Sequence, residues 1–476
     1  MTLRPHACRR SGLSLLAFAT LAGCASVGVA PSLSRTNAVT AAFTDGHLAL
    51  RQTDEDRASA ARAADELLRQ PLGQREAVQL ALLNSPAVQS MVAQSWADAN
   101  AAAQTGRIGN PVFTFERFRM ANELELGRLL SFGLLDLLTL PTRTDLARQR
   151  MEQTRLRLNA DVVDQVTAVR QAWVKAVAAQ QTVQYTQQVF DSAEASAELA
   201  RRMQAAGNFN KLARARQQAF YADAATQLAS ASHAATSARE ELVRALGLTD
   251  VQAASLRLPA RLPDLPKTAR DAAEVTQMAN QTRLDIQLAQ AALDAAARAQ
   301  GLTQFTSLTD VELGLRRDSV SDRAAGTTAI KHGFELGVRL PLFDNGSAQR
   351  QAMNAQTLAA ANRLEATARA ASSHLRESYS AYRTAHDIAR HYRDEVIPLR
   401  QTISEENVLR YNGMLIGVFE LLADSRDQIG SVLAAIAAEQ QFWLADAALQ
   451  AAVIGRPTLA AAGLPSAAAG AGDGGP

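Results

Sequence analysis

The residue types that usually carry chemistry are scattered along this chain. No two of its seven histidines have ligand spacing on one helix face. The sequence contains no glycine-rich phosphate loop, and Gly346-Ser347, the only elbow-like serine, has no base nearby in a recognisable motif. We interpret the methionines as core gap-fillers rather than a soft-metal relay. The sequence therefore indicates no enzyme and no metal or cofactor, apart from a covalent lipid on one cysteine.

That cysteine, Cys24, stands where a secretory signal peptide would be cleaved. Basic residues are concentrated between positions 4 and 10, an apolar run covers 13–22, and small residues precede Cys24, which predicts a signal peptide over 1–23. The segment Leu21-Ala22-Gly23-Cys24 resembles the bacterial lipobox, which implies that Cys24 is lipidated, with palmitate among its acyl chains. By the same resemblance, Ala25 in place of aspartate implies export to the outer membrane. The alternative is an ordinary secretory peptide with an incidental cysteine. Because Cys8 leaves with the signal peptide, no disulfide is possible in the mature chain.

Composition favours a helical protein that does not bind nucleic acid. The formal net charge is +2, from 49 basic and 47 acidic residues, and no basic patch has interleaved aromatics. Alanine, the residue with the highest helix propensity, is abundant throughout. No second apolar run is long enough to span a bilayer as a helix. Any membrane crossing beyond the lipid must therefore be made by β-strands.

Helical periodicity covers most of the chain. Residues 142–206 contain neither proline nor glycine. A helix of that length would extend about 100 Å, which is typical of coiled coils and helical barrels rather than of globular domains. Further helices are predicted over 53–69, 71–104, 211–245, 269–299, 347–411 with an interruption at Pro398, and from Gly413 to about Ile454.

Two regions instead show the alternation of β-strands. In the first, residues 112–118 carry β-branched and aromatic residues with partial alternation, and a second strand is predicted somewhere within 123–140. In the second, strands are predicted over 310–316 and 333–340, separated by a polar loop over 318–328. The proline-rich segment 256–267 predicts a linker.

The order of these elements occurs twice. Pro141 and Pro341 are followed at similar distances by Gly207 and Gly413, the predicted turns between a long and a shorter helix. This spacing indicates duplication of a whole unit rather than a solenoid repeat. We therefore divide the chain into a signal peptide (1–23), a lipidated N-terminal extension (24–70), a first repeat (71–265, strands about 111–140), a second repeat (266–456, strands about 310–340) and a disordered tail (457–476).

Four strands per chain make an open sheet, and its bare edges would be prohibitive in lipid. Several chains must then close one barrel, with eight strands from two chains or twelve from three. The long amphipathic helices likewise need neighbours along their length. A barrel in the membrane and helices in the periplasm would form a continuous tube.

Three stretches of the chain match motifs of one known family: 76–86 (EAVQLALLNSP), 337–346 (GVRLPLFDNG) and 410–423 (RYNGMLIGVFELLA). On these stretches, the chain resembles the TolC family of outer-membrane efflux proteins over about residues 71–455. The resemblance implies a homotrimer with a twelve-stranded barrel, an α-helical barrel, and an inner-membrane pump joined through a periplasmic adaptor. The lipobox points to the lipoprotein branch, the outer-membrane factors of RND-type efflux systems.

The resemblance also assigns the periplasmic tip. Gly207 and Gly413 correspond to the tip turns. Family members often carry acids six and nine residues after the tip glycine, where this chain has Phe419 and Leu422, with Glu420 adjacent. These three residues form a candidate entrance constriction, apolar unless Glu420 faces the lumen.

The sequence thus predicts a passive exit duct of an efflux or secretion system, located in the outer membrane. The alternative is a structural periplasmic coiled-coil lipoprotein without channel activity, which accounts for the helices and Cys24 but not for two alternating strand pairs. An enzyme would need a site that the sequence lacks. The cargo, whether drug, metal ion, solvent or peptide, stays open, as does the identity of pump and adaptor.

Overall fold

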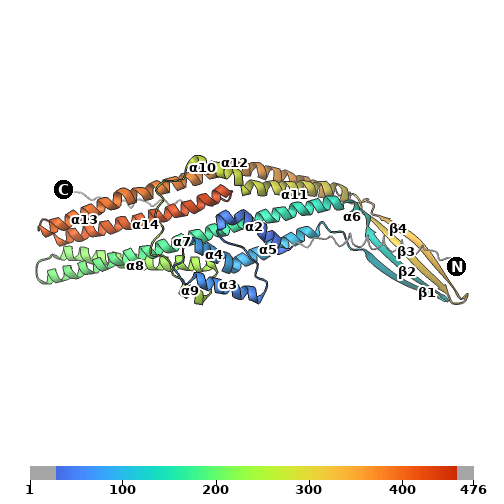
Figure 1. Ribbon diagram of the computed structural model, residues 1–476, viewed down its shortest axis with the longest axis horizontal. Helices are drawn as coiled ribbons and strands as arrows, with labels where there is room; N and C mark the ends of the chain where they lie inside the picture. The colour runs from blue at the N-terminus through green and yellow to red at the C-terminus, as the bar shows by residue number, and fades with distance from the viewer. Residues whose placement is uncertain (1–27, 458–476) are drawn as a thin grey trace, which may run out of the picture. The chain divides into compact units, whose positions relative to one another are not determined.

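The computed structural model describes residues 28–457 (Figure 1); the predicted signal peptide, Cys24 and the tail beyond Pro457 lie outside the described residues. The described chain is mainly helical with one small antiparallel sheet, which confirms the predicted fold class at this level. It divides into two compact units. Of the described residues, the sheet unit comprises 28–34, 93–157 and 287–366, and the helix unit comprises 35–92, 158–286 and 367–457. In chain order the elements are α2 (Val29–Thr44), α3 (Asp54–Leu67), α4 (Gln74–Asn84), α5 (Pro86–Gln104), β1 (Val112–Met120), β2 (Glu123–Gly133), α6 (Leu134–Leu138), α7 (Leu140–Ala205), α8 (Lys211–Leu246), α9 (Asp250–Ser255), α10 (Ala272–Thr282), α11 (Leu284–Thr306), β3 (Val311–Asp322), β4 (Thr327–Val338), α12 (Ser347–His391), η1 (Tyr392–Val396), α13 (Ile397–Asn412) and α14 (Val418–Ile454).

The sheet unit joins one hairpin from each repeat. β1 and β2 form the first hairpin and β3 and β4 the second, and β2 pairs antiparallel with β3, so the order is β1-β2-β3-β4 (Figure 1). The first hairpin turns through Ala121 and Asn122, with Ala121 at φ 46°. Within the described residues, β1 and β4 have no further strand beside them. In the part of the chain that the structure describes, both edges of the sheet are therefore bare.

The strands differ in extent from the sequence prediction. β3 continues to Asp322 and β4 begins at Thr327, so the predicted polar loop over 318–328 is wrong, and the turn is only 323–326. Backbone pairing continues there although the side chains are polar, and the Ser321 and Thr328 hydroxyls lie 3.1 Å apart across the strands. In the first repeat, β2 ends at Gly133 and the following leucines form the short helix α6.

Each repeat begins with a kinked pair of helices, where the sequence predicted a single helix. α4 and α5 meet at Ser85, and α10 and α11 meet at Arg283; both residues are extended, at ψ 123° and ψ 93°. Pro86 explains the first kink, because proline disfavours helical backbone in the residue before it. At the second kink, the Arg283 guanidinium is bound by Asp285 at 2.6 Å and by the Ala371 carbonyl at 2.9 Å.

A glycine with a left-handed backbone conformation lies against each kink. Gly247 (φ 67°) ends α8, and a Cβ added there would lie 2.6 Å from the Ser85 Cα. Gly455 (φ 89°) ends α14, and its added Cβ would lie 3.0 Å from the backbone nitrogen of Asp285. In both repeats, glycine thus lets the end of the last helix approach the kink between the first two.

The N-terminal extension contributes to the core of the helix unit, although the sequence predicted a helix in it only over 53–69. Helix α2 buries Thr36 and Thr40. The Arg170 guanidinium donates to the Phe43 carbonyl and lies 4.4 Å from the centre of its ring. Farther along, the buried Trp173 indole donates to the Leu72 carbonyl at 2.7 Å. The contact of Phe43 holds the extension against α7, and the contact of Leu72 holds the start of the first repeat against the same helix.

The predicted interruption at Pro398 takes the form of a π-helical turn. η1 lies directly before α13, in which Pro398 occupies the first turn. Proline has no N–H to donate and its ring crowds the preceding turn, so a local π-helical adjustment accommodates it. None of the described helices is both long and apolar enough to cross a membrane.

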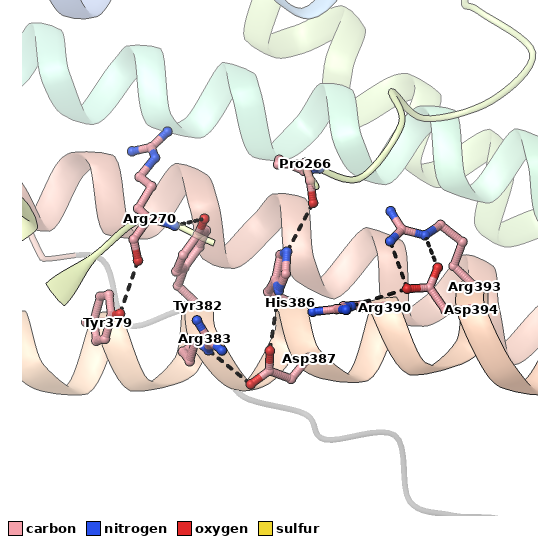
Figure 2. A network of polar contacts seen from close by, with 10 residues as sticks. All are labelled: Pro266, Arg270, Tyr379, Tyr382, Arg383, His386, Asp387, Arg390, Arg393 and Asp394. Carbon is pink, nitrogen blue, oxygen red and sulfur yellow. Dashed lines mark hydrogen bonds and ion pairs between the residues drawn. The ribbon is translucent and has the colours of Figure 1, made fainter. Parts of the chain in front are cut away.

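Side chains of α12 form hydrogen bonds with the backbone of the linker before α10 (Figure 2). The Tyr379 hydroxyl donates to the Arg270 carbonyl, and the Tyr382 hydroxyl accepts from the Arg270 N–H, both at 3.1 Å. The buried His386 lies 3.1 Å from the Pro266 carbonyl through Nε2, which must donate because a carbonyl only accepts. Tyr382 and His386 also pack against Phe442 of α14, which places the linker over the core of the second repeat.

Candidate functional site

The sheet is the first candidate site because its two faces have opposite chemistry. Side chains alternate between faces along a strand, and directly paired residues share a face. The register therefore assigns every strand residue to one face. One of them, the acidic face, carries seven carboxylates and two basic residues, whereas the other, the apolar face, carries no carboxylate. The acidic face has Glu116, Glu123, Glu125, Glu312, Asp318, Asp322 and Glu335 as carboxylates, and Arg316 and Lys331 as bases.

Arg316 organises the centre of the acidic face. Its guanidinium contacts Glu116 at 3.0 Å, Asp318 at 2.8 Å and Glu335 at 2.9 Å. These carboxylates come from β1, β3 and β4, so one arginine ties together strands of both repeats. Gly127 of β2 leaves the space for this cluster, since a Cβ there would lie 3.2 Å from a Glu116 carboxylate oxygen. Charge-assisted hydrogen bonds of this kind fix the geometry of a polar surface.

The apolar face is exposed in the single chain. Large side chains of all four strands lie across it in register, among them Phe113, Leu130, Leu315 and Phe334. Phe334 is 75% exposed and Phe113 is 62% exposed. Contiguous apolar surface of this kind marks a contact with lipid or with another protein. The two faces together have the polarity expected of a wall between lipid and water.

The turns between the long helices are the second candidate site. The structure places Gly207 in the turn from α7 to α8 with φ 77°, and Asn208 N–H donates to the Met203 carbonyl. In the turn from α13 to α14, the equivalent bond runs from Leu415 to Arg410, and the left-handed residue is Met414 at φ 56°, not Gly413 at φ −79°. Gly413 therefore lies in its turn without using the freedom of a glycine.

The three candidate constriction residues differ in their surroundings. The Phe419 ring stacks on Phe209 with centres 4.6 Å apart, which joins the two turns to each other. Glu420 is exposed in the first turn of α14, and Leu422 is partly buried. One turn beyond Glu420, Asp424 has a buried carboxylate oxygen with no hydrogen-bond partner among the described residues. Glu420 thus follows the stacked Phe419 directly in the chain as an exposed carboxylate.

The sequence missed the most informative contacts of both sites. The Phe209–Phe419 pair joins residues far apart in the chain, and no local pattern signals it. The separation of charge between the sheet faces was visible within each strand as alternation, but only the pairing register aligns four strands on a common face. Among the described residues, no group of three or more histidine, cysteine, aspartate or glutamate side chains could hold a metal ion.

Comparison with known proteins supports the fold. A membrane protein from Pseudomonas aeruginosa matches with a TM-score of 0.65 and 21% identity, over 80% of this chain and 93% of that one. The outer membrane protein VceC of Vibrio cholerae matches with a TM-score of 0.64 and 15% identity, over 83% and 97%. The CmeC outer membrane channel of Campylobacter jejuni gives 0.63 and 14%, over 89% and 92%. No family model and no curated protein matches the sequence. At these identities the likeness shows the fold alone, and for the fold it confirms the resemblance to TolC-type outer-membrane channels.

Proposed function

We propose that this chain is an outer-membrane channel that serves as the exit duct of a tripartite efflux or secretion system. The observation that carries the proposal is the sheet with one acidic and one exposed apolar face, on a fold shared with outer membrane channels. In a membrane, the apolar face would contact lipid and the acidic face would line a water-filled passage.

Three chains would complete the barrel. β1 and β4 are bare edges in the single chain, and unpaired backbone groups are prohibitive in hydrocarbon. Pairing β4 of one chain with β1 of the next removes every edge when the ring closes, and the TolC-type fold favours a ring of three chains with twelve strands. The long helices of the three chains would continue the duct in the periplasm as a helical barrel.

The remaining parts of the proposal follow from the sequence and the resemblance. Cys24 would carry the lipid anchor, with no other cofactor and no catalytic activity. The α7–α8 and α13–α14 turns would form the periplasmic tip, where Phe419, Glu420 and Leu422 constrict the entrance. A periplasmic adaptor and an inner-membrane pump would deliver the cargo, which the duct passes passively.

The alternative is a structural coiled-coil lipoprotein, which would use the same helices without a pore. It offers no reason for a sheet that keeps all seven carboxylates on one face and large exposed apolar side chains on the other.

The deciding experiment is native mass spectrometry of the detergent-extracted membrane protein, followed by conductance measurements in planar bilayers. We expect a trimer with a lipid mass on Cys24 in each chain, and stepwise conductance on reconstitution. A Cys24→Ala variant separates the anchor from the barrel, because it should lose the lipid mass yet still give conducting trimers. A monomer that is released without detergent and does not conduct would refute the duct and leave the coiled-coil scaffold.

A further inference from the structure

The apolar face of the sheet changes character along the strands. From the ends that connect to helices, its first three rows are apolar, the third being Phe113, Leu130, Leu315 and Phe334. The next three rows, toward the hairpin turns, contain all the basic residues of this face between apolar ones. These rows are Phe115–Arg128–Arg317–His332, Arg117–Leu126–Ser319–Ile330 and Arg119–Leu124–Ser321–Thr328.

The arginines of these rows, Arg117, Arg119, Arg128 and Arg317, have no carboxylate to pair with. Every acid of the strands lies on the opposite face, and among the described residues none of the four forms an ion pair. Arg316 on the acidic face, by contrast, binds three carboxylates. Arg117, Arg119 and Arg317 are exposed and Arg128 is half-buried. This basic belt therefore has its hydrogen-bonding capacity free for an anion outside the chain.

The position of the basic belt indicates what that anion is. Successive rows on one face lie about 7 Å apart, so the belt covers about 14 Å next to the apolar rows. Apolar side chains mixed into the belt suit the boundary between hydrocarbon and headgroups, where arginine reaches toward the polar layer. A guanidinium matches phosphate by bidentate hydrogen bonding, and four of them without an ion-pair partner among the described residues make a surface suited to phosphate groups.

We propose that the basic belt binds the phosphate groups of a phosphorylated glycolipid in the outer leaflet of the outer membrane. The inference rests on the proposed function, because it requires the sheet to span the membrane with its hairpin turns outward. The leaflet around the turns is then the outer one. Its phosphate groups lie just outside the hydrocarbon, so we expect them to contact Arg128 and Arg317, which are directly paired in the row of the basic belt next to the apolar rows.

The test titrates the purified full-length trimer in detergent with diphosphoryl lipid A and counts bound lipid by native mass spectrometry. Parallel titrations use dephosphorylated lipid A, phosphatidylglycerol, and lipid A in the presence of inorganic phosphate. We expect Arg128→Gln/Arg317→Gln to weaken lipid A binding about 30-fold, from the loss of two basic contacts with an anionic surface. Arg128→Lys/Arg317→Lys, which keeps both charges but not the bidentate geometry, should bind lipid A more tightly than the glutamine variant and more weakly than the wild type.

Lys331→Gln is the matched control for the single variant Arg317→Gln. Each variant removes one positive charge, from β4 or from the neighbouring β3, but Lys331 lies on the acidic face, so only Arg317→Gln should weaken binding.

Equal binding of lipid A by the wild type and by the double glutamine variant, or equal binding of lipid A and dephosphorylated lipid A by the wild type, would overturn the proposal. Phosphatidylglycerol binding as tightly would show a general anionic-lipid surface, and millimolar phosphate competing fully would show a site for free phosphate; either also overturns it. Trimer mass and conductance are scored in the same samples, so loss of lipid selectivity alone refutes the basic belt, whereas absence of a conducting trimer refutes the duct.

Discussion

Single residues in the helix unit show how polar groups join distant segments. Asp446 of α14 is buried, and its carboxylate contacts the Arg270 guanidinium at 3.1 Å and the Gln450 amide at 2.6 Å. Burial raises the pKa of the Asp446 carboxyl, and the charge of Arg270 with the hydrogen bond from Gln450 offsets only part of that effect. The ionised carboxylate is therefore less stable in the folded chain than in water.

This environment predicts a pH dependence of stability. Because its pKa is raised on folding, Asp446 binds more protons in the folded state, so the free energy of unfolding falls as pH rises. The fall begins at a pH near 3.8, the ordinary pKa of the carboxyl, and ends where the pH has passed the raised pKa of Asp446 in the folded state. We expect Asp446→Asn to flatten this part of the profile, measured as unfolding temperature by circular dichroism between pH 4 and pH 8.

Asp394→Asn is a control of opposite sign. Hydrogen bonds from Arg393 and Arg390 lower the pKa of the Asp394 carboxyl, so its contribution to stability is present above the ordinary pKa and lost as pH falls. An unchanged slope in Asp446→Asn would show that other groups cause the dependence of the wild type.

At the scale of elements, the turns between long helices depend on one left-handed residue each. Gly207 occupies that position at low cost, but Met414 occupies it at φ 56° with a side chain that is 93% exposed. We expect Met414→Gly to stabilise the protein by about 1 kcal/mol, because a left-handed backbone is unfavourable for a residue with a Cβ. Chemical denaturation would measure the change in the free energy of unfolding.

Gly413→Ala is the control and should leave the free energy of unfolding nearly unchanged, since Gly413 has φ −79° and its added Cβ meets nothing closer than 3.5 Å. A destabilised Met414→Gly would mean that the exposed methionine makes contacts beyond the single chain.

Replacing a glycine that lies against a kink should destabilise the protein more than replacing a glycine in a turn between long helices. At Gly455, an added Cβ would have a left-handed backbone and would lie 2.4 Å from the Asp285 carboxylate, which Arg283 holds in place. Gly207 has the same backbone strain with no atom within 4 Å of the added Cβ. We expect Gly455→Ala to cost about 2–4 kcal/mol and Gly207→Ala about 1 kcal/mol, from strain with and without overpacking. Equal losses in denaturation experiments would exclude the close approach at Gly455.

The sequence predicted the elements that depend on local signals. Helical periodicity, Pro141 and Pro341, and the turn glycines gave the duplicated order, because each acts within a few residues. The kink at Arg283 was not predicted, since it depends on contacts with distant residues such as Arg283 donating to the Ala371 carbonyl at 2.9 Å. The kink at Ser85 has a local signal in Pro86, which the prediction of one helix over 71–104 overlooked. The left-handed Met414 and the burial of α2 likewise depend on tertiary packing, which overrides local preference.

At the scale of the whole molecule, the charge separation between the sheet faces determines what the sheet can do. The near-zero net charge of the chain conceals it, because seven carboxylates gather on one face while four arginines and a histidine gather on the other. Three copies around a closed barrel would bring twenty-one carboxylates and six basic residues into one lumen, three times the seven and two of a single chain. Such a lumen concentrates cations along its wall.

The proposed duct should therefore prefer cations, and Glu312 offers the cleanest test. It is exposed on the acidic face and outside the Arg316 cluster, so Glu312→Gln removes one charge per chain and leaves that cluster intact. We expect the cation preference, measured as reversal potential in a salt gradient across a planar bilayer, to fall in this variant. The fall should be larger at low salt, because charges more than about 10 Å from the ion path are screened at 0.1 M. Glu55→Gln makes the same chemical change on the exposed start of α3, which belongs to the helix unit, and should leave the reversal potential unchanged. If Glu312→Gln behaves like Glu55→Gln at every salt concentration, the acidic face does not line the path of the ions.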